Sequence, residues 1–178
     1  MALLYKVPNN HIVLIERFGK YSRIQASGLR MKMPFFESIK AVEDWEGIAN
    51  KGGYQLDLSE QQSHTPRRHF KSLDNLSVFA DVSIGWKITD PVKAVYSIDV
   101  LPTSIVYIGI KALRRNIGDL YLDQILSNRQ KLNGMLLERL TEIAGGWGIE
   151  ITKVEAYVKC DSLDKKGIQK KPANASGL

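Results

Sequence analysis

Few side chains in this 178-residue chain have types and spacing suited to chemistry. Two of its three histidines, His64 and His69, lie five residues apart in a segment that contains proline. They therefore do not share a helical face, as the i, i+4 histidines of a zinc site do. The single cysteine, Cys160, has no neighbouring histidine to activate it as a nucleophile. We expect neither a catalytic residue nor a metal site among these side chains.

The glycine pairs do not match a phosphate-binding loop. Gly52 and Gly53 are not followed by the Lys and the Ser or Thr that a P-loop needs. Gly145 and Gly146 follow a predicted helix, whereas a phosphate cradle precedes one. The carboxylates are scattered, and no spacing pairs them for acid–base work. The sequence therefore predicts a protein that is not an enzyme and has no cofactor.

One basic cluster, residues 67–71, mixes three cations and a histidine with an aromatic side chain. Such a mixture is typical of nucleic-acid contacts, but no recognised nucleic-acid-binding module surrounds it. We expect residues 61–71 to form an exposed, solvated hairpin or loop. Nucleic acid is therefore the weakest of the partners considered.

Composition and charge indicate one globular domain with a basic extension. Apolar residues make up 44% and charged residues 25% of the chain, which is ordinary globular usage. Of the net charge of +6, residues 159–178 carry +3, from five Lys and two Asp. We expect a folded domain over residues 1–159 and a disordered basic tail over residues 160–178. No signal peptide and no run of about 18 apolar residues is found in this sequence.

The clearest element is a long strand over residues 76–88. Apolar residues occupy every second position and predict one buried face and one wet face. Phe79 is the exception, because it lies among the polar residues. It either covers a loop of the same chain or contacts a neighbouring subunit. Asp90 and Pro91 then predict the N-cap and first residue of a short helix.

Shorter strands come before this one, and helices come after it. Strands are expected over residues 12–18, 29–33, 35–45 and 55–59. Apolar residues at helical spacing predict a helix from Pro102 to Gly118 and one long helix over residues 123–144. Alternation resumes over residues 149–158, with a parity change that indicates a bulge. This order predicts the α+β class, with a mixed or antiparallel sheet, a long C-terminal helix and a returning strand.

Taken together, these segments resemble the SPFH domain, also called Band 7, of the stomatin and prohibitin group, closest to the stomatin-like branch. The resemblance covers residues 5–159. The matching segments are residues 15–21 (IERFGKY), 28–29 with 33–35 (GL…MPF), 74–78 (DNLSV), 89–94 (TDPVKA), 113–118 (LRRNIG), 122–133 (LDQILSNRQKLN) and 147–155 (WGIEITKVE).

The resemblance implies a scaffold without catalytic activity that lies on the inner face of a membrane and assembles with copies of itself. Such proteins organise lipid microdomains and modulate channels, transporters or membrane proteases. Family members usually begin with a hydrophobic anchor and continue into a coiled coil. Neither pattern is present in this sequence, so we expect an excised domain or a minimal member.

The resulting hypothesis is a peripheral membrane scaffold on the cytoplasmic or equivalent inner face. Five apolar side chains are expected to form either a lipid-facing rim or part of the core: Leu29, Met31, Met33, Phe35 and Phe36. Four side chains are candidates for self-association: Phe79, Glu138, Arg139 and Glu142. The alternatives are a soluble adaptor or inhibitor of a membrane protease that makes no lipid contact, and nucleic-acid binding through residues 67–71.

Overall fold

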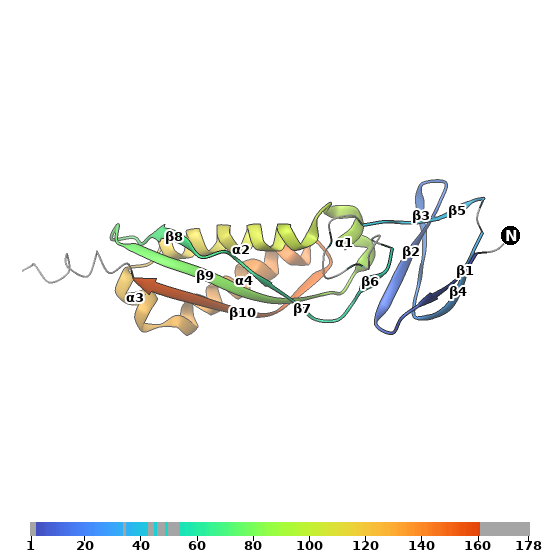
Figure 1. Ribbon diagram of the computed structural model, residues 1–178. Helices are drawn as coiled ribbons and strands as arrows, with labels where there is room; N and C mark the ends of the chain where they lie inside the picture. The colour runs from blue at the N-terminus through green and yellow to red at the C-terminus, as the bar shows by residue number, and fades with distance from the viewer. Residues whose placement is uncertain (1–2, 34, 43–44, 46–48, 50–53, 161–178) are drawn as a thin grey trace, which may run out of the picture.

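The computed structural model describes residues 3–33, 35–42, 45, 49 and 54–160 (Figure 1). The strands are β1 (Leu3–Val7), β2 (His11–Arg17), β3 (Lys20–Gln25), β4 (Gly28–Lys32), β5 (Glu37–Ile39), β6 (Leu56–Asp57), β7 (Gln61–His64), β8 (Arg68–Lys71), β9 (Ser77–Ile88) and β10 (Ile149–Cys160). The helices are α1 (Pro91–Ser97), α2 (Leu101–Gly118), α3 (Leu122–Ser127) and α4 (Arg129–Gly145). Strands come first, helices follow and β10 returns to the sheet, which confirms the predicted α+β class.

The main sheet is built on the long strand β9. It pairs antiparallel with β10 along one edge and with the short strands β7 and β8 along the other. The predicted alternation is confirmed, since every second residue of β9 from Val78 to Ile88 is buried. The register of β10 shifts between Ile151 and Lys153, which confirms the predicted bulge.

Helices α2 and α4 cover the buried face of this sheet (Figure 1). Gly109 lets α2 approach closely, because a Cβ atom there would lie 2.8 Å from Ile84 Cδ1 and 3.0 Å from Thr65 Cγ2. Asp90 caps α1 by accepting a hydrogen bond from the Lys93 amide, as the sequence predicts.

Most of residues 61–71 are exposed as expected, but they form two strands and not a hairpin or loop. β7 and β8 are consecutive edge segments that both pair with β9, and Phe70 lies in the core. Pro66 interrupts the edge, because proline has no amide hydrogen to donate to a neighbouring strand. Thr65 bridges the interruption: its amide donates to Val82 O, and its hydroxyl accepts from Val82 N at 2.8 Å.

The single helix expected over residues 123–144 is two helices, α3 and α4. Asn128 separates them with φ −134° and ψ 72°, and its side chain accepts a hydrogen bond from the Lys131 amide. A local side-chain cap thus competes with continuation of the helix. Two of the apolar residues whose helical spacing predicts the single helix with a buried face, Leu126 and Ile143, are exposed.

The expected strand over residues 35–45 is shorter than predicted. Among the described residues of this range, only Glu37–Ile39 form a strand, β5. Gly52 and Gly53 lie outside the described residues, as does the predicted tail except for its first residue, Cys160, which ends β10.

Residues 3–40 form an N-terminal lobe at one end of the elongated molecule (Figure 1). β2 is buried on both faces, which explains its unbroken aliphatic run. Ile12 and Leu14 join the main core, whereas Val13 and Ile15 pack with Val7 in a small separate core. The lobe is joined to the helices by Tyr96, whose hydroxyl donates to the Glu16 carboxylate at 2.7 Å.

Two of the helical glycines, Gly134 and Gly109, give opposite predictions for substitution by alanine. At Gly134 a Cβ atom meets nothing within 4 Å, so Gly134→Ala should raise the free energy of unfolding by about 1 kcal/mol. Gly109→Ala should lower it by about 1–2 kcal/mol, because its methyl group must displace the buried Ile84 side chain. Urea unfolding followed by circular dichroism measures both, and stabilisation by Gly109→Ala would contradict the close α2–β9 contact.

Candidate functional site

One face of the two-stranded β1–β4 ribbon is apolar and exposed. Leu4 pairs with Met31, and Lys6 pairs with Leu29, so these four side chains lie on the same face. The three apolar members are all exposed, with Leu29 at 68%. The opposite face carries Val7, which is buried in the small core. The ribbon therefore reverses the usual arrangement, in which the solvent face is polar.

Exposed aromatic side chains also occur at the loops of the lobe. Phe18 is 77% exposed at the β2–β3 turn, and its ring meets that of Phe36 edge-to-face, with 5.6 Å between centroids. Phe35 is 84% exposed. Phe18 also has φ +50°, a left-handed conformation that disfavours bulky residues. Among the described residues, the other non-glycine residues with positive φ are two asparagines, Asn10 and Asn75, which tolerate it.

We call this set of exposed side chains the apolar rim: Leu4, Phe18, Leu29, Met31, Met33, Phe35 and Phe36. All five residues predicted as rim or core are exposed, so core packing does not account for them. Sequence reasoning missed Leu4 and Phe18. The sequence does give one indication that Phe18 is exposed. Phe18 directly precedes the turn glycine Gly19, and the residue at such a position is expected to be exposed and polar.

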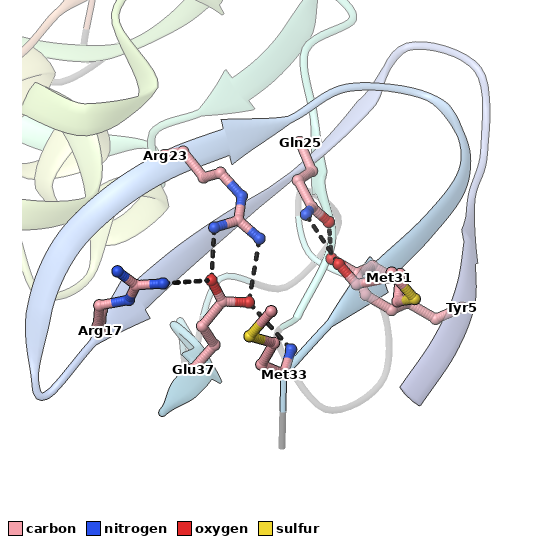
Figure 2. A network of polar contacts seen from close by, with 7 residues as sticks. All are labelled: Tyr5, Arg17, Arg23, Gln25, Met31, Met33 and Glu37. Atoms are coloured by element: carbon pink, nitrogen blue, oxygen red, sulfur yellow. Dashed lines mark hydrogen bonds and ion pairs between the residues drawn. The ribbon is translucent and has the colours of Figure 1, made fainter. Parts of the chain in front are cut away.

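A buried carboxylate anchors the loop that carries the aromatic part of the rim (Figure 2). The Glu37 side chain is 2% exposed and accepts two hydrogen bonds from the Arg23 guanidinium, at 2.5 and 3.0 Å. It also accepts the Met33 amide at 3.0 Å, and Arg17 lies 3.7 Å away. A single side chain therefore ties β3 and the end of β4 to β5.

These contacts change the acidity of Glu37. Hydrogen bonds from Arg23 and then from the Met33 amide are the largest causes, and together they lower its pKa from 4.5 to about 2. Burial acts in the opposite direction but is outweighed. The carboxylate is therefore ionised at neutral pH and holds Met33 in place.

A second polar contact fixes the ribbon itself (Figure 2). The Gln25 side chain is nearly buried; it accepts a hydrogen bond from the Tyr5 hydroxyl and donates one to Met31 O at 3.2 Å. The amide thus connects β3 to both strands of the ribbon. Met31 and Met33 are each held through their backbones, while their side chains remain exposed.

Positive charge is concentrated in the same lobe. Residues 1–40 contain seven Lys or Arg and two Glu, a net charge of +5. Residues 41–158 contain 13 Lys or Arg and 15 Asp or Glu, a net charge of −2. The exposed apolar surface therefore belongs to the basic end of an otherwise slightly acidic domain.

The other candidate residues lie away from the rim, in the main sheet and helices. Phe79 contacts its own chain, with its ring edge-to-face against His69 at 5.1 Å. In the basic cluster, Phe70 is buried, and Arg67 forms an ion pair with Asp81 at 2.7 Å. The cluster therefore does not present its aromatic ring for stacking on a base.

The candidates on α4 do not act as one surface. Glu138 is exposed to solvent, whereas Arg139 and Glu142 line an open groove between α2 and α4. Within the described ranges, no three His, Cys, Asp or Glu side chains gather into a metal-binding group. No single helix in those ranges is long and apolar enough to cross a bilayer; only the bent pair α1 and α2, at 80°, passes such a test jointly.

Comparison with known sequences agrees with this architecture. The profile of the SPFH domain / Band 7 family matches residues 5–158, nearly all of the described chain. The chain belongs to this family. The SPFH assignment confirms the resemblance stated above and covers both the rim-bearing lobe and the main sheet.

Named relatives support the stomatin-like branch. The chain is 35% identical over 142 residues to an uncharacterized protein of Methanothermobacter thermautotrophicus, covering 80% of this chain and 40% of the relative. It is 26% identical over 149 residues to human stomatin-like protein 2, mitochondrial, covering 84% and 38% respectively. An uncharacterized protein of Mycobacterium tuberculosis is 28% identical over 149 residues, covering 84% and 36%. The chain thus spans about two fifths of the length of these relatives.

Replacement of the buried carboxylate should alter the acid stability of this SPFH domain. Because the folded pKa of Glu37 lies below its unfolded value, its contribution is complete above about pH 4.5 and is lost as the pH falls toward about 2. Glu37→Gln should therefore lower the thermal midpoint at pH 7 and make it less dependent on pH in that window.

Circular dichroism melts between pH 7 and 2.5 provide the measurement. Glu138→Gln, which changes an exposed carboxylate, is the matched control and should follow the wild type. If Glu37→Gln kept the full acid dependence of the wild type, the ionised Glu37 network would not stabilise the lobe.

Replacing Phe18 by asparagine should stabilise the folded domain. The left-handed conformation costs a bulky residue about 1–2 kcal/mol, and an exposed aromatic pair returns only about 0.5 kcal/mol. Phe18→Asn should thus raise the free energy of unfolding by about 0.5–1 kcal/mol in urea titrations. A loss above about 1 kcal/mol would show that the Phe18–Phe36 contact is a structural requirement of the turn.

Proposed function

We propose that this SPFH domain is a scaffold without catalytic activity that docks peripherally on the inner face of an anionic membrane through its apolar rim. The observation that carries the proposal is the exposed apolar surface on a lobe with net charge +5. Family membership supports it, since stomatin-like SPFH proteins are often membrane-associated scaffolds.

The rim has enough apolar surface for interfacial binding. Complete burial of a Leu, Met or Phe side chain contributes about 1.5–3 kcal/mol. Partial insertion of three rim side chains would therefore contribute about 3–5 kcal/mol. The most exposed members, Phe35, Phe18 and Leu29, are the ones expected to enter the lipid.

The charge of the lobe supplies the second attraction. A Lys or Arg close to an anionic leaflet contributes about 1 kcal/mol. Lys6 lies on the same face as Leu4 and Leu29, so inserting these leucines brings its ammonium group to the headgroups. Apolar insertion and cation attraction together meet the two-signal requirement for stable peripheral binding.

Assembly is the second part of the proposal. With the lobe on the membrane, the main sheet and helices extend away from it along the long axis of the molecule (Figure 1). The exposed surfaces at Phe79 and Glu138 then remain accessible to further copies of the chain or to membrane partners such as channels, transporters or proteases.

Flotation with vesicles tests the docking step. The chain should float with vesicles that contain anionic phosphatidylserine and should do so less at high salt, because screening weakens the cation term. Leu29→Glu should reduce the bound fraction at least about tenfold, since it removes apolar surface and adds charge repulsion.

Leu73→Glu is the matched control, because Leu73 is an exposed leucine outside the lobe, between β8 and β9. It should bind vesicles as the wild type does. Equal losses in both variants would place the contact elsewhere. Failure of the wild type to float with any vesicle composition would favour the alternative, an adaptor or inhibitor of a membrane protease that does not touch lipid.

A further inference from the structure

An open groove of about 730 Å³ lies between α2 and α4, on the helical side of the main domain. Its lining combines apolar and charged side chains: Ile108, Lys111, Ala112, Arg115, Arg139, Glu142 and Ile143. The groove is outside the lobe and shares no residue with the apolar rim. It is large enough for several residues of a bound peptide.

One charged group in this groove lacks a hydrogen-bond acceptor. The Nη1 atom of Arg139 is buried and has no partner within the described part of the chain. A buried guanidinium N–H without an acceptor is costly, and a carboxylate is the acceptor whose geometry suits it best. Nη1 itself is closed to solvent, so Arg139 contributes to the groove as a positive charge and not through this N–H.

The surrounding charges favour the same kind of ligand. Lys111 and Arg115 lie one helical turn apart on α2 and both line the groove. Three cations thus face one carboxylate, Glu142.

Apolar side chains in the groove exclude a purely electrostatic contact. Ile143 is 38% exposed at the groove, and Ala112 forms part of the lining. A partner that fills the groove must therefore present both an apolar side chain and carboxylates. An amphipathic helix with one acidic face and one apolar face presents both.

We propose that the α2–α4 groove binds an acidic amphipathic helical segment of a partner protein, with Lys111, Arg115 and Arg139 as the cations that attract its carboxylates. A second copy of this chain is a poorer match, because its two long helices are themselves basic: α2 carries three cations and no carboxylate, and α4 carries three cations and two glutamates. This binding site does not depend on membrane docking, so each of the two proposals can fail alone.

The test is fluorescence anisotropy with two labelled peptides of about four helical turns. One has leucines at i, i+3, i+4 and i+7 with glutamates between them, and the other has lysine in place of each glutamate. The wild-type chain should bind the glutamate peptide at least about tenfold more tightly than the lysine peptide.

Matched variants locate the contact. Arg139→Gln and Arg115→Gln should each weaken binding of the glutamate peptide about tenfold, which is the loss expected for one charge-assisted hydrogen bond. Arg114→Gln is the control, because Arg114 is exposed on α2 and does not line the groove. Hydrogen exchange of the wild-type chain should also show peptide-dependent protection in α2 and α4, independent of any variant.

Four results would overturn the proposal. Three of them are equal affinity for the two peptides, an equal loss of affinity in Arg114→Gln and Arg115→Gln, and peptide-dependent protection outside α2 and α4. A fourth is a dimer, seen by analytical ultracentrifugation, that Arg139→Gln dissociates in a chain that binds neither peptide. That result would assign the groove to a second copy of the chain.

Discussion

The N-terminal lobe is too small to cover both faces of its β1–β4 ribbon, and the exposed apolar surface of the molecule follows from this constraint. In the part of the lobe that the structure describes, its separate small core contains three buried apolar side chains, Val7, Val13 and Ile15. These cover one face of the ribbon, and the other face carries Leu4, Leu29 and Met31 in the open. Small folded units bury a smaller fraction of their surface than large ones. Here the part left uncovered is apolar, which is typical of an interaction surface.

Buried polar groups keep this exposed surface in one conformation. Glu37 binds Arg23 and the Met33 amide, and Gln25 connects Tyr5 to the Met31 carbonyl. The hydrogen bonds act on the backbone, so the methionine side chains stay free to adapt to a lipid surface. A loose apolar loop would instead have to be ordered on binding, at a cost in entropy. The lobe is therefore pre-organised where it is most apolar.

Periodicity predicted the main sheet well, because β9 and β10 each bury one face and their alternation reports it directly. Local caps were harder to foresee. Asn128 ends a helix although the apolar spacing continues past it, since its side chain offers the Lys131 amide an alternative partner. The order of the family motifs predicted the fold.

The site was only partly predictable. The sequence identified five of the seven rim residues but could not separate rim from core, because an alternating strand has the same pattern whichever face is covered. The buried role of Glu37 and the unpartnered Arg139 both depend on contacts between residues far apart in the chain. The central claim is tested most directly with a nitroxide label at Leu29→Cys in a Cys160→Ser background, using electron paramagnetic resonance with anionic vesicles. The account predicts that the label becomes accessible to oxygen and inaccessible to a water-soluble nickel complex. A label that stays fully accessible to nickel while the protein is bound to vesicles would contradict it.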